Sequence, residues 1–485
     1  MTIEQLFNEA QVIAFLCNQY GDTGKGKFAN AAAQWADVNA RGTGGDNAGH
    51  TFYLEDGREV ILHVVPVGIE YDSIGKTSVL GQGMVINPKS LVAELDILDQ
   101  LKLSYNNLMI SQDAHVITPF HVALDKAKNQ SLENGGIGST GKGIGPCYED
   151  KIGRRGIRIG DLLNVDVLAK KVKKLADERY SSLGLNVDEV IAELSQHNTR
   201  LKPFVMDTTT EMQSFHRRGM KISLEGAQGL LLSSEFGTYP YNTSSDCSLN
   251  GTASGVGLSA KAVDKSFGLV KFPVMSRVGG GPFTTEICGK VGEAYCKEKG
   301  RNRISELKES DFLFDEKTGK CDYNLPQNKY KMEEMLHSPD QLTVAAGLRL
   351  QAGEFGATTG RLRRLGWIDA VAGRYAVNVN GPLMILTKAD AFAGLAYIKM
   401  ATSYVTKYAE DNSPVYTQEF NRDLEFLNKA KPSYRTYEGY ESLKGINNRE
   451  DLPEGLSTAI KDFEEITRGR VVAVSVGPKK DETLF

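Results

Sequence analysis

A short loop near the N-terminus combines glycines, lysines and one acid in a pattern suited to binding phosphate. Residues 18–27 spell Asn-Gln-Tyr-Gly-Asp-Thr-Gly-Lys-Gly-Lys and follow an apolar run at 12–17. A strand, a glycine turn and a helix start would aim backbone N–H groups at an anion. The spacing Gly-x4-Gly-Lys is present, but Phe28 stands where a P-loop needs Ser or Thr to hold magnesium. Since Asp22 lies inside the loop instead, we expect a phosphate loop of another kind.

A second glycine cluster, at residues 41–51, carries one histidine among small side chains. Taken alone, His50 is equally compatible with a tight turn and no chemistry. Beside a phosphate loop, an imidazole can donate a proton or stabilise developing charge. We therefore treat His50 as a candidate catalytic residue.

A third glycine cluster, at residues 135–146, is followed by a basic stretch. Its run of N–H donors, together with Thr140, suits a second anion such as a nucleoside monophosphate. Residues 148–158 then place four cations among few acids. A solvated basic face is one interpretation. The other is phosphate capture by Arg154, because a guanidinium matches phosphate oxygens.

Two segments in the C-terminal half indicate an acidic substrate and a guanine nucleotide. Residues 357–367, Ala-Thr-Thr-Gly-Arg-Leu-Arg-Arg-Leu-Gly-Trp, form a cationic loop suited to an acidic substrate and a triphosphate. An apolar run at 383–386 is followed by Thr-Lys-Ala-Asp at 387–390. Asp390 could accept two N–H donors from guanine while the stem of Lys388 covers the ring. Adenine lacks that donor pair, so the motif predicts GTP.

Alternating strand-like and helix-like segments must position these loops. Residues 77–86 resemble a strand, and Asn87 with Pro88 is a typical helix start. Leucines then recur at helical spacing as far as Leu101. Repeated strand–helix order favours an α/β fold with a large, mostly parallel sheet flanked by helices. Residues 293–334 are highly charged with few apolar anchors, and we expect an irregular surface excursion there.

Composition narrows the class of protein. The chain has 485 residues, of which 41% are hydrophobic and 24% charged, with a net charge of −4. That balance shows no excess of positive charge of the kind that binds nucleic acid or an acidic membrane. Six scattered cysteines indicate reduced thiols, and neither a signal peptide nor a membrane-length apolar run is present. We expect a cytoplasmic protein with small-molecule substrates.

Taken together and in order, these motifs resemble the adenylosuccinate synthetase family over nearly the whole chain. The resemblance implies that family's fold, distantly similar to P-loop NTPases, as a single domain over residues 1–485. A charged insertion is expected at about 297–349. The matching segments are 21–27, 47–51, 140–146, 148–151, 225–229, 281–283, 358–361, 387–390 and 475–478.

The resemblance implies a GTP- and Mg²⁺-dependent ligase that joins L-aspartate to C6 of IMP through a 6-phosphoryl-IMP intermediate. Asp22 would take the purine N1 proton and also bind the metal with the backbone of Gly49. His50 would stabilise the charge of phosphoryl transfer. Arg154 would reach IMP from the neighbouring subunit, which implies a homodimer. The implied catalytic residues are Asp22, His50 and Gln228. The implied IMP residues are Asp22, Lys25, Asn47, His50, Thr140, Arg154, Gln228, Thr243 and Arg361. The implied aspartate residues are Ala357, Thr358, Thr359, Arg361 and Arg363. The implied GTP residues are Gly21, Gly24, Gly49, His50, Thr51, Arg363, Lys388, Asp390, Ser475 and Gly477.

Two alternatives stay open at this level. Thr23 replaces the family's loop glutamate, and a sister group of viral enzymes with this fold aminates GMP or dGMP instead. The loop acid is typically lost in that group, so the presence of Asp22 favours IMP. A GTP-binding switch without ligase chemistry is the alternative of another class. A switch needs one nucleotide, whereas this chain provides for two nucleotides and an amino acid.

Overall fold

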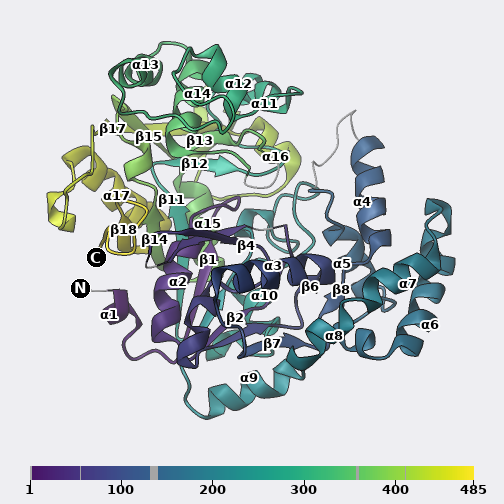
Figure 1. Ribbon diagram of the computed structural model, residues 1–485. Coiled ribbons are helices and arrows are strands. Elements are labelled where there is room, and N and C mark those ends of the chain that lie inside the picture. Colours follow the sequence, from purple (N-terminus) through teal and green to yellow (C-terminus); the bar gives the residue numbers. More distant parts are fainter. Residues whose placement is uncertain (1–2, 48, 55, 132–139, 357–359, 410) are drawn as a thin grey trace. The chain divides into compact units, whose positions relative to one another are not determined.

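A ten-stranded sheet forms the centre of the fold. The computed structural model describes residues 3–47, 49–54, 56–131, 140–356, 360–409 and 411–485 (Figure 1). The strand order is β19-β18-β14-β11-β1-β10-β2-β5-β7-β9. The strands that flank β10 and β5 are parallel to them, and the edge strand β19 is antiparallel to β18. The predicted α/β class with a large, mostly parallel sheet is therefore confirmed.

The chain divides into two compact units. The first unit contains Met1–Cys17 and Gly24–Phe267, and the second contains Asn18–Thr23 and Gly268–Phe485. The short segment Asn18–Thr23, which includes Asp22, thus groups with the C-terminal half of the chain. No helix among the described residues is both long and apolar enough to cross a membrane.

The first unit is built on buried parallel strands. Every residue of β1 is buried, as expected for a parallel strand covered on both faces. Its core joins Val12, Leu16, Leu224 and Val256. Helices α6 and α7 lie side by side in this unit (Figure 1). The strands are β1 (Val12–Cys17), β2 (Val38–Arg41), β3 (His50–Tyr53), β4 (Glu59–Leu62), β5 (Thr77–Leu80), β6 (Val85–Ile86), β7 (Leu108–Ser111), β8 (His115–Val116), β9 (Val205–Met206) and β10 (Ile222–Glu225). The helices are α1 (Ile3–Phe7), α2 (Lys25–Trp35), α3 (Pro88–Leu101), α4 (Pro119–Ser131), α5 (Ile144–Ile152), α6 (Val165–Leu175), α7 (Val187–Ser195), α8 (Asn198–Leu201), α9 (Thr208–Arg217) and α10 (Leu249–Ser254).

Local signals set the helix starts in this unit. The Asn87 side chain accepts a hydrogen bond from the Lys89 backbone, so α3 begins at Pro88 as predicted. The strand expected over 77–86 is instead two strands, β5 and β6, separated by a turn. Gly83 in that turn packs so close to the Gly42 carbonyl that a Cβ would lie 1.9 Å from its oxygen. This backbone approach breaks the strand.

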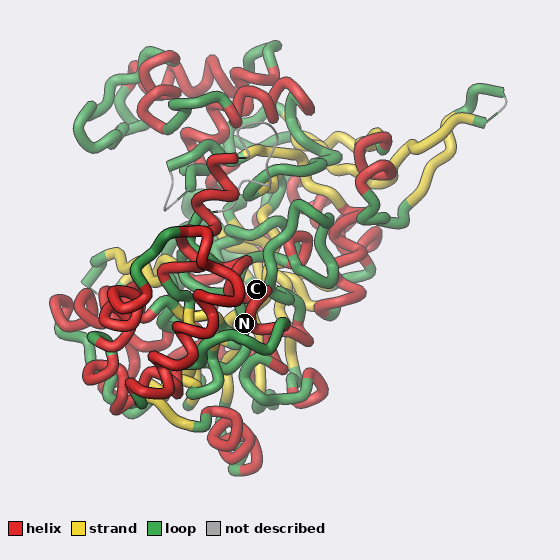
Figure 2. The backbone as a smooth tube through the Cα atoms, turned by 90° about the vertical axis from the view of Figure 1, so that its right-hand side faces the viewer, coloured by secondary structure: helices red, strands yellow, loops and turns green. Residues whose placement is uncertain are grey.

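The second unit contains the remaining strands of the large sheet and a five-stranded mixed sheet. Strands β12, β13, β15 and β16 follow one another in the second sheet, and β17 pairs with β15. Figure 2 shows β15 and β16 running outward together as a hairpin arm. The strands are β11 (Lys265–Lys271, which begins in the first unit), β12 (Val274–Arg277), β13 (Arg364–Asp369), β14 (Leu383–Thr387), β15 (Tyr397–Tyr408), β16 (Pro414–Thr417), β17 (Lys431–Glu438), β18 (Arg470–Ser475) and β19 (Thr483–Leu484). The helices are α11 (Gly289–Lys297), α12 (Arg303–Glu309), α13 (Pro326–Leu336), α14 (Gln341–Ala352), α15 (Ala370–Asn380), α16 (Leu424–Lys429) and α17 (Glu454–Thr467).

The expectation of an irregular segment at 293–334 was wrong. Half of this stretch lies in helices α11, α12 and α13, and α14 follows directly. Asn302 caps α12, and its side chain accepts from the Ser305 backbone. Leu307, Met332 and Met335 are buried. A few apolar residues at helical spacing, together with good caps, suffice to order a highly charged sequence. The assignment of 297–349 as an insertion stays a prediction.

Candidate active site

The phosphate loop leads into a partly buried group of polar residues in the first unit. Helix α2 starts at Lys25, and Gly24 before it adopts a left-handed conformation with φ of 70°. Lys25 Nζ donates to the Gln228 carbonyl at 2.8 Å, and Gln228 Nε2 donates to Asn47 Oδ1 at 2.7 Å. Three residues predicted to hold IMP therefore lie together, although they are far apart in the sequence.

The packing of α2 explains one glycine of the loop. A Cβ on Gly26 would lie 2.3 Å from the carbonyl oxygen of Thr51, which is in β3. No side chain can occupy that position without moving one of the two backbones. The loop is consequently held against the strand that carries His50.

His50 is held by a carboxylate that comes from a distant strand. Its Nδ1 bonds to Oε1 of Glu225 at the end of β10, and Glu225 Oε2 accepts from the Val67 backbone at 3.1 Å. Both side chains are buried, and His50 Nε2 has no hydrogen-bond partner among the described residues. Burial, and then the charges of Arg41 and Lys25, lower the pKa of His50 well below its ordinary value. A neutral imidazole with its proton on Nδ1 follows, which leaves Nε2 able to accept a hydrogen bond.

Asp22 lies among cations in the second unit. Its backbone is left-handed, with φ of 55°, and its side chain is 45% exposed. Asp22 Oδ2 is 3.5 Å from Arg363 Nε and 3.9 Å from Lys271 Nζ. A half-exposed carboxylate beside two cations is accessible to a ligand.

The predicted guanine residues follow two neighbouring parallel strands, β14 and β18, where each strand ends. Lys388 Nζ donates to the Ala352 carbonyl and to Glu354 Oε1, both at 2.9 Å. Ser475 Oγ donates to the Gly477 carbonyl at 3.0 Å. Asp390 begins the short helical turn after Lys388. The carboxyl ends of parallel strands are the usual edge for ligands in such sheets.

Arg154 is exposed at the end of α5, with φ of 60°. Its neighbours are paired within the unit, since Arg155 Nε lies 2.9 Å from Asp150 and Arg158 Nη1 lies 2.7 Å from Asp113. Thr140 is exposed just before α5, and Thr243 is half-buried in the loop after β10. These residues do not join the Lys25–Gln228–Asn47 group through any hydrogen bond that the described structure contains.

The structure describes only some of the residues predicted to bind aspartate and GTP. Ala357, Thr358 and Thr359 lie outside the described residues. Arg361, on the far side of that gap, is exposed. Gly21 has φ of 88° in the phosphate loop, and Gly49 is exposed immediately before β3.

Some residues predicted to be functional have a left-handed backbone. Ten non-glycine residues in the described chain have positive φ, and four of them are Asp22, Arg154, Gln228 and Lys388. A non-glycine residue in this region costs free energy, and such residues cluster at sites where a side chain must be aimed.

Three site residues were missed from the sequence: Glu225, Lys271 and Glu354. Glu225 lies inside a motif, but its link to His50 spans 175 residues. Lys271 ends a buried strand, and a lone lysine closing an apolar run is a signal that could have been noticed. Glu354 has no local pattern that separates it from other acids.

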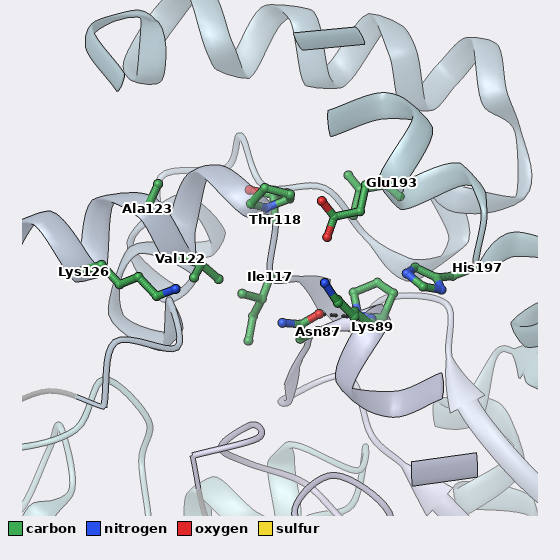
Figure 3. Close-up of a pocket in the computed structure, with 12 residues that line it drawn as sticks. Asn87, Lys89, Ile117, Thr118, Val122, Ala123, Lys126, Glu193 and His197 are labelled. Atoms are coloured by element: carbon green, nitrogen blue, oxygen red, sulfur yellow. Dashed lines mark hydrogen bonds between the residues drawn. The ribbon is translucent and has the colours of Figure 1, made fainter. Parts of the chain in front are cut away.

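A separate pocket in the first unit contains none of the predicted site residues. It has a volume of about 320 Å³. Figure 3 shows Asn87 and Lys89 from the start of α3, Val122 and Lys126 from α4, and Glu193 from α7 around it. Most of its lining is apolar. Because its residues are distinct from the motif residues, we do not assign the predicted chemistry to it.

Comparison with known proteins identifies relatives of the whole chain. The model of the adenylosuccinate synthetase family matches residues 14–484. Adenylosuccinate synthetase of Myxococcus xanthus is 36% identical over 483 residues, with 96% of each chain covered. That of Clostridium perfringens is 36% identical over 476 residues, again with 96% of each covered.

Solved structures agree. The fully ligated adenylosuccinate synthetase of Plasmodium falciparum has a TM-score of 0.79 and 29% identity, covering 98% of this chain and 99% of that one. The succinoaminodeoxyadenylate synthetase of cyanophage S-2L, solved with dGMP and dATP, has a TM-score of 0.52 and 18% identity, covering 98% and 95%. The second likeness shows the fold alone. On the strength of the family model and the full-length relatives, this chain belongs to the adenylosuccinate synthetase family, a family of ligases in purine biosynthesis.

Proposed function

We propose that the chain joins L-aspartate to C6 of IMP at the expense of GTP, giving adenylosuccinate, GDP and phosphate. The observation that carries the proposal is the Asp22 carboxylate, which is 45% exposed within a phosphate loop and faces Lys271 and Arg363. A GTP switch has no use for a reactive acid at that position. An enzyme that must activate a purine oxygen needs one.

In the proposed first step, Asp22 takes the proton from N1 of IMP. The electron pair released reaches O6, which attacks the γ-phosphorus of GTP, and GDP leaves. His50 faces the phosphoryl group through Nε2, the atom without a partner among the described residues. When phosphate anions surround it, the imidazole takes up a proton, because Glu225 balances the positive charge.

In the second step, the aspartate amine attacks C6 of 6-phosphoryl-IMP and the C6–O6 bond breaks. Phosphate leaves with O6, and the nitrogen loses its proton. We assign the substrate's carboxylates to the loop at 357–363. Arg363 would serve there as a cation that also approaches the triphosphate.

A magnesium ion would be held by Asp22 and the backbone of Gly49, as the family resemblance implies. No cluster of three or more histidine, cysteine or acidic side chains that could hold a metal is present among the described residues. Magnesium commonly takes only one or two carboxylates, with phosphates and water completing its octahedron, so a lone Asp22 is a suitable donor. When bound, the ion would neutralise charge on the transferred phosphoryl group.

We also propose a homodimer in which Arg154 contacts IMP bound to the neighbouring subunit. Arg154 is exposed, and the arginines beside it are engaged in ion pairs within their own unit. A guanidinium held outward on a strained backbone suits contact with the phosphate of a ligand in another subunit.

The direct test is product formation from a purine panel. With GTP, Mg²⁺ and aspartate present, IMP, dIMP, GMP and dGMP are compared by the absorbance change of the succinyl product. Turnover of IMP is expected. Turnover of dGMP without IMP would replace the proposal by the GMP/dGMP alternative, and GTP hydrolysis with no purine product would favour a switch.

Asp22→Ala tests the base separately. This variant is expected to bind GDP and to form no product, because nothing takes the N1 proton. Substantial remaining turnover would assign the base to another group.

A further inference from the structure

Lys271 is a cation completely buried in the second unit, at the end of β11. The phosphate-loop segment is bonded to its backbone: Gln19 Nε2 donates to the Lys271 carbonyl at 3.0 Å, and the Lys271 N–H donates to Gln19 Oε1 at 2.9 Å. The same residue that anchors the segment 18–23 therefore also aims an ammonium group at Asp22.

The hydrogen bonds of Lys271 fix the position of this ammonium group. Lys271 Nζ lies 2.6 Å from each carboxylate oxygen of Glu354 and 2.8 Å from Ser276 Oγ. An ammonium group has three N–H donors, so these three acceptors satisfy it. Asp22 Oδ2 lies 3.9 Å from Lys271 Nζ, beyond hydrogen-bond range, so the two groups interact through their charges alone.

Glu354 is shared by two lysines. It is fully buried after α14 and accepts from Lys388 Nζ at 2.9 Å as well as from Lys271. The charges thus alternate along a continuous row: Asp22, Lys271, Glu354 and Lys388. One end of the row is the proposed base and the other is the proposed guanine-covering lysine.

We propose that Lys271 and Glu354 form a buried charge bridge that positions Asp22 and Lys388 together. Both are positioning residues, and their assignment rests on the proposed function of the two residues they hold. Glu354 and Ser276 hold Lys271 Nζ at a fixed distance from Asp22, just beyond hydrogen-bond range. The Glu354 carboxylate draws Lys388 back, so that its stem lies where the guanine ring would stack.

Stability alone does not require such a bridge. Two buried charges lose their hydration, and an apolar pair of similar volume is often as stable or more stable. What we expect this ion pair to contribute is therefore the orientation of Asp22 and Lys388, the residues at its two ends. This difference provides the test.

The test variant is the double substitution Lys271→Met with Glu354→Met, which removes both charges at nearly constant volume. It is expected to fold with a thermal midpoint close to that of the wild type. Affinity for a fluorescent GDP analogue is expected to fall by about tenfold or more, a size common for residues that orient site groups. At saturating substrates, kcat is expected to fall by a similar factor, while the KM for IMP changes little.

A matched control lies in the same unit. Arg349 and Glu306 form another buried ion pair, with Arg349 Nε 2.8 Å from Glu306 Oε1. Among the described residues, neither side chain forms a hydrogen bond or ion pair with a predicted site residue. The double variant Arg349→Met with Glu306→Met is expected to leave GDP affinity and kcat unchanged. A second test variant, Glu354→Gln, retains the shape of the side chain and is expected to weaken GDP binding as well.

The proposal would be overturned if the Lys271/Glu354 double variant had the same GDP affinity and kcat as the wild type. Equal losses in the control pair would also overturn it, because the effect would then follow any buried ion pair. The GDP titration needs no turnover. If the wild type makes no product from any purine, the proposed function fails, and the titration still decides whether the bridge orients Lys388.

Discussion

The bond between Glu225 and His50 gives a sharp quantitative prediction. Glu225→Gln keeps the size of the side chain but removes its charge. The carboxylate accepts from two donors, His50 Nδ1 and the Val67 N–H. A glutamine amide has one acceptor oxygen, so one of the two donors must face an NH₂ group. The variant therefore loses either the anchor of the Val67 segment or the group that balances a positively charged His50.

The expected size follows from the burial of this pair. Hydrogen bonds to charged groups contribute roughly 1.5–3 kcal/mol. Since about 1.4 kcal/mol changes a rate tenfold, the loss of this bond when charge develops beside His50 should lower kcat roughly 10- to 150-fold. The measurement is initial rate of product formation at saturating GTP, IMP and aspartate. The KM for IMP should change much less, because Lys25, Asn47 and Gln228 are untouched.

A buried carboxylate elsewhere in the first unit provides the control. Asp72 is buried and accepts from the Asn106 and Asn107 backbones at 3.0 and 2.7 Å. Among the described residues, its side chain forms no hydrogen bond with a predicted site residue. Asp72→Asn should lower the free energy of unfolding without lowering kcat. The reasoning is refuted if Glu225→Gln keeps kcat within about twofold of the wild type, or if Asp72→Asn reduces kcat as much.

Other substitutions test the fold and the site at separate points. Burial raises the pKa of Asp369 to about 6, so the stability that depends on this group is complete below its unfolded pKa and is lost as pH rises through about 6. A rise in pKa from 3.8 to about 6 corresponds to a loss of about 3 kcal/mol in the free energy of unfolding. Asp369→Asn should remove this loss. A difference between variant and wild type in urea unfolding that did not change with pH would contradict the prediction. Arg154→Ala should raise the KM for IMP about tenfold with little change in thermal midpoint. The control Arg155→Ala breaks an ion pair with the buried Asp150 and should lower the thermal midpoint. An unchanged KM in Arg154→Ala would show that Arg154 does not belong to the IMP site. Gly26→Ala places a Cβ 2.3 Å from the Thr51 carbonyl oxygen and should lower the free energy of unfolding by about 1–3 kcal/mol. If the variant is as stable as the wild type, the start of α2 can move away from β3 at no cost.

Local chemistry made parts of the structure predictable. Asn87 followed by Pro88 fixed a helix start, because a cap bond and a preset φ act within three residues. The apolar runs at 12–17 and 383–386 became buried strands for a similar reason, since parallel strands covered on both faces need uninterrupted apolar sequence. The charged segment at 293–334 misled us, because its few buried residues gain their stability from packing that the sequence does not display.

By itself, the sequence determined the loops, their order and the family to which the chain belongs. The phosphate loop with Asp22, the Lys388–Asp390 motif and the glycine clusters are all local patterns. Only the tertiary structure decided which charges face them. His50 meets Glu225 across 175 residues, and Lys271 meets Glu354 across 83. The linear sequence does not indicate which group a carboxylate or an ammonium group will pair with. The partner is chosen by where the strands end in the folded sheet, and burial there strengthens each pair that the fold brings together.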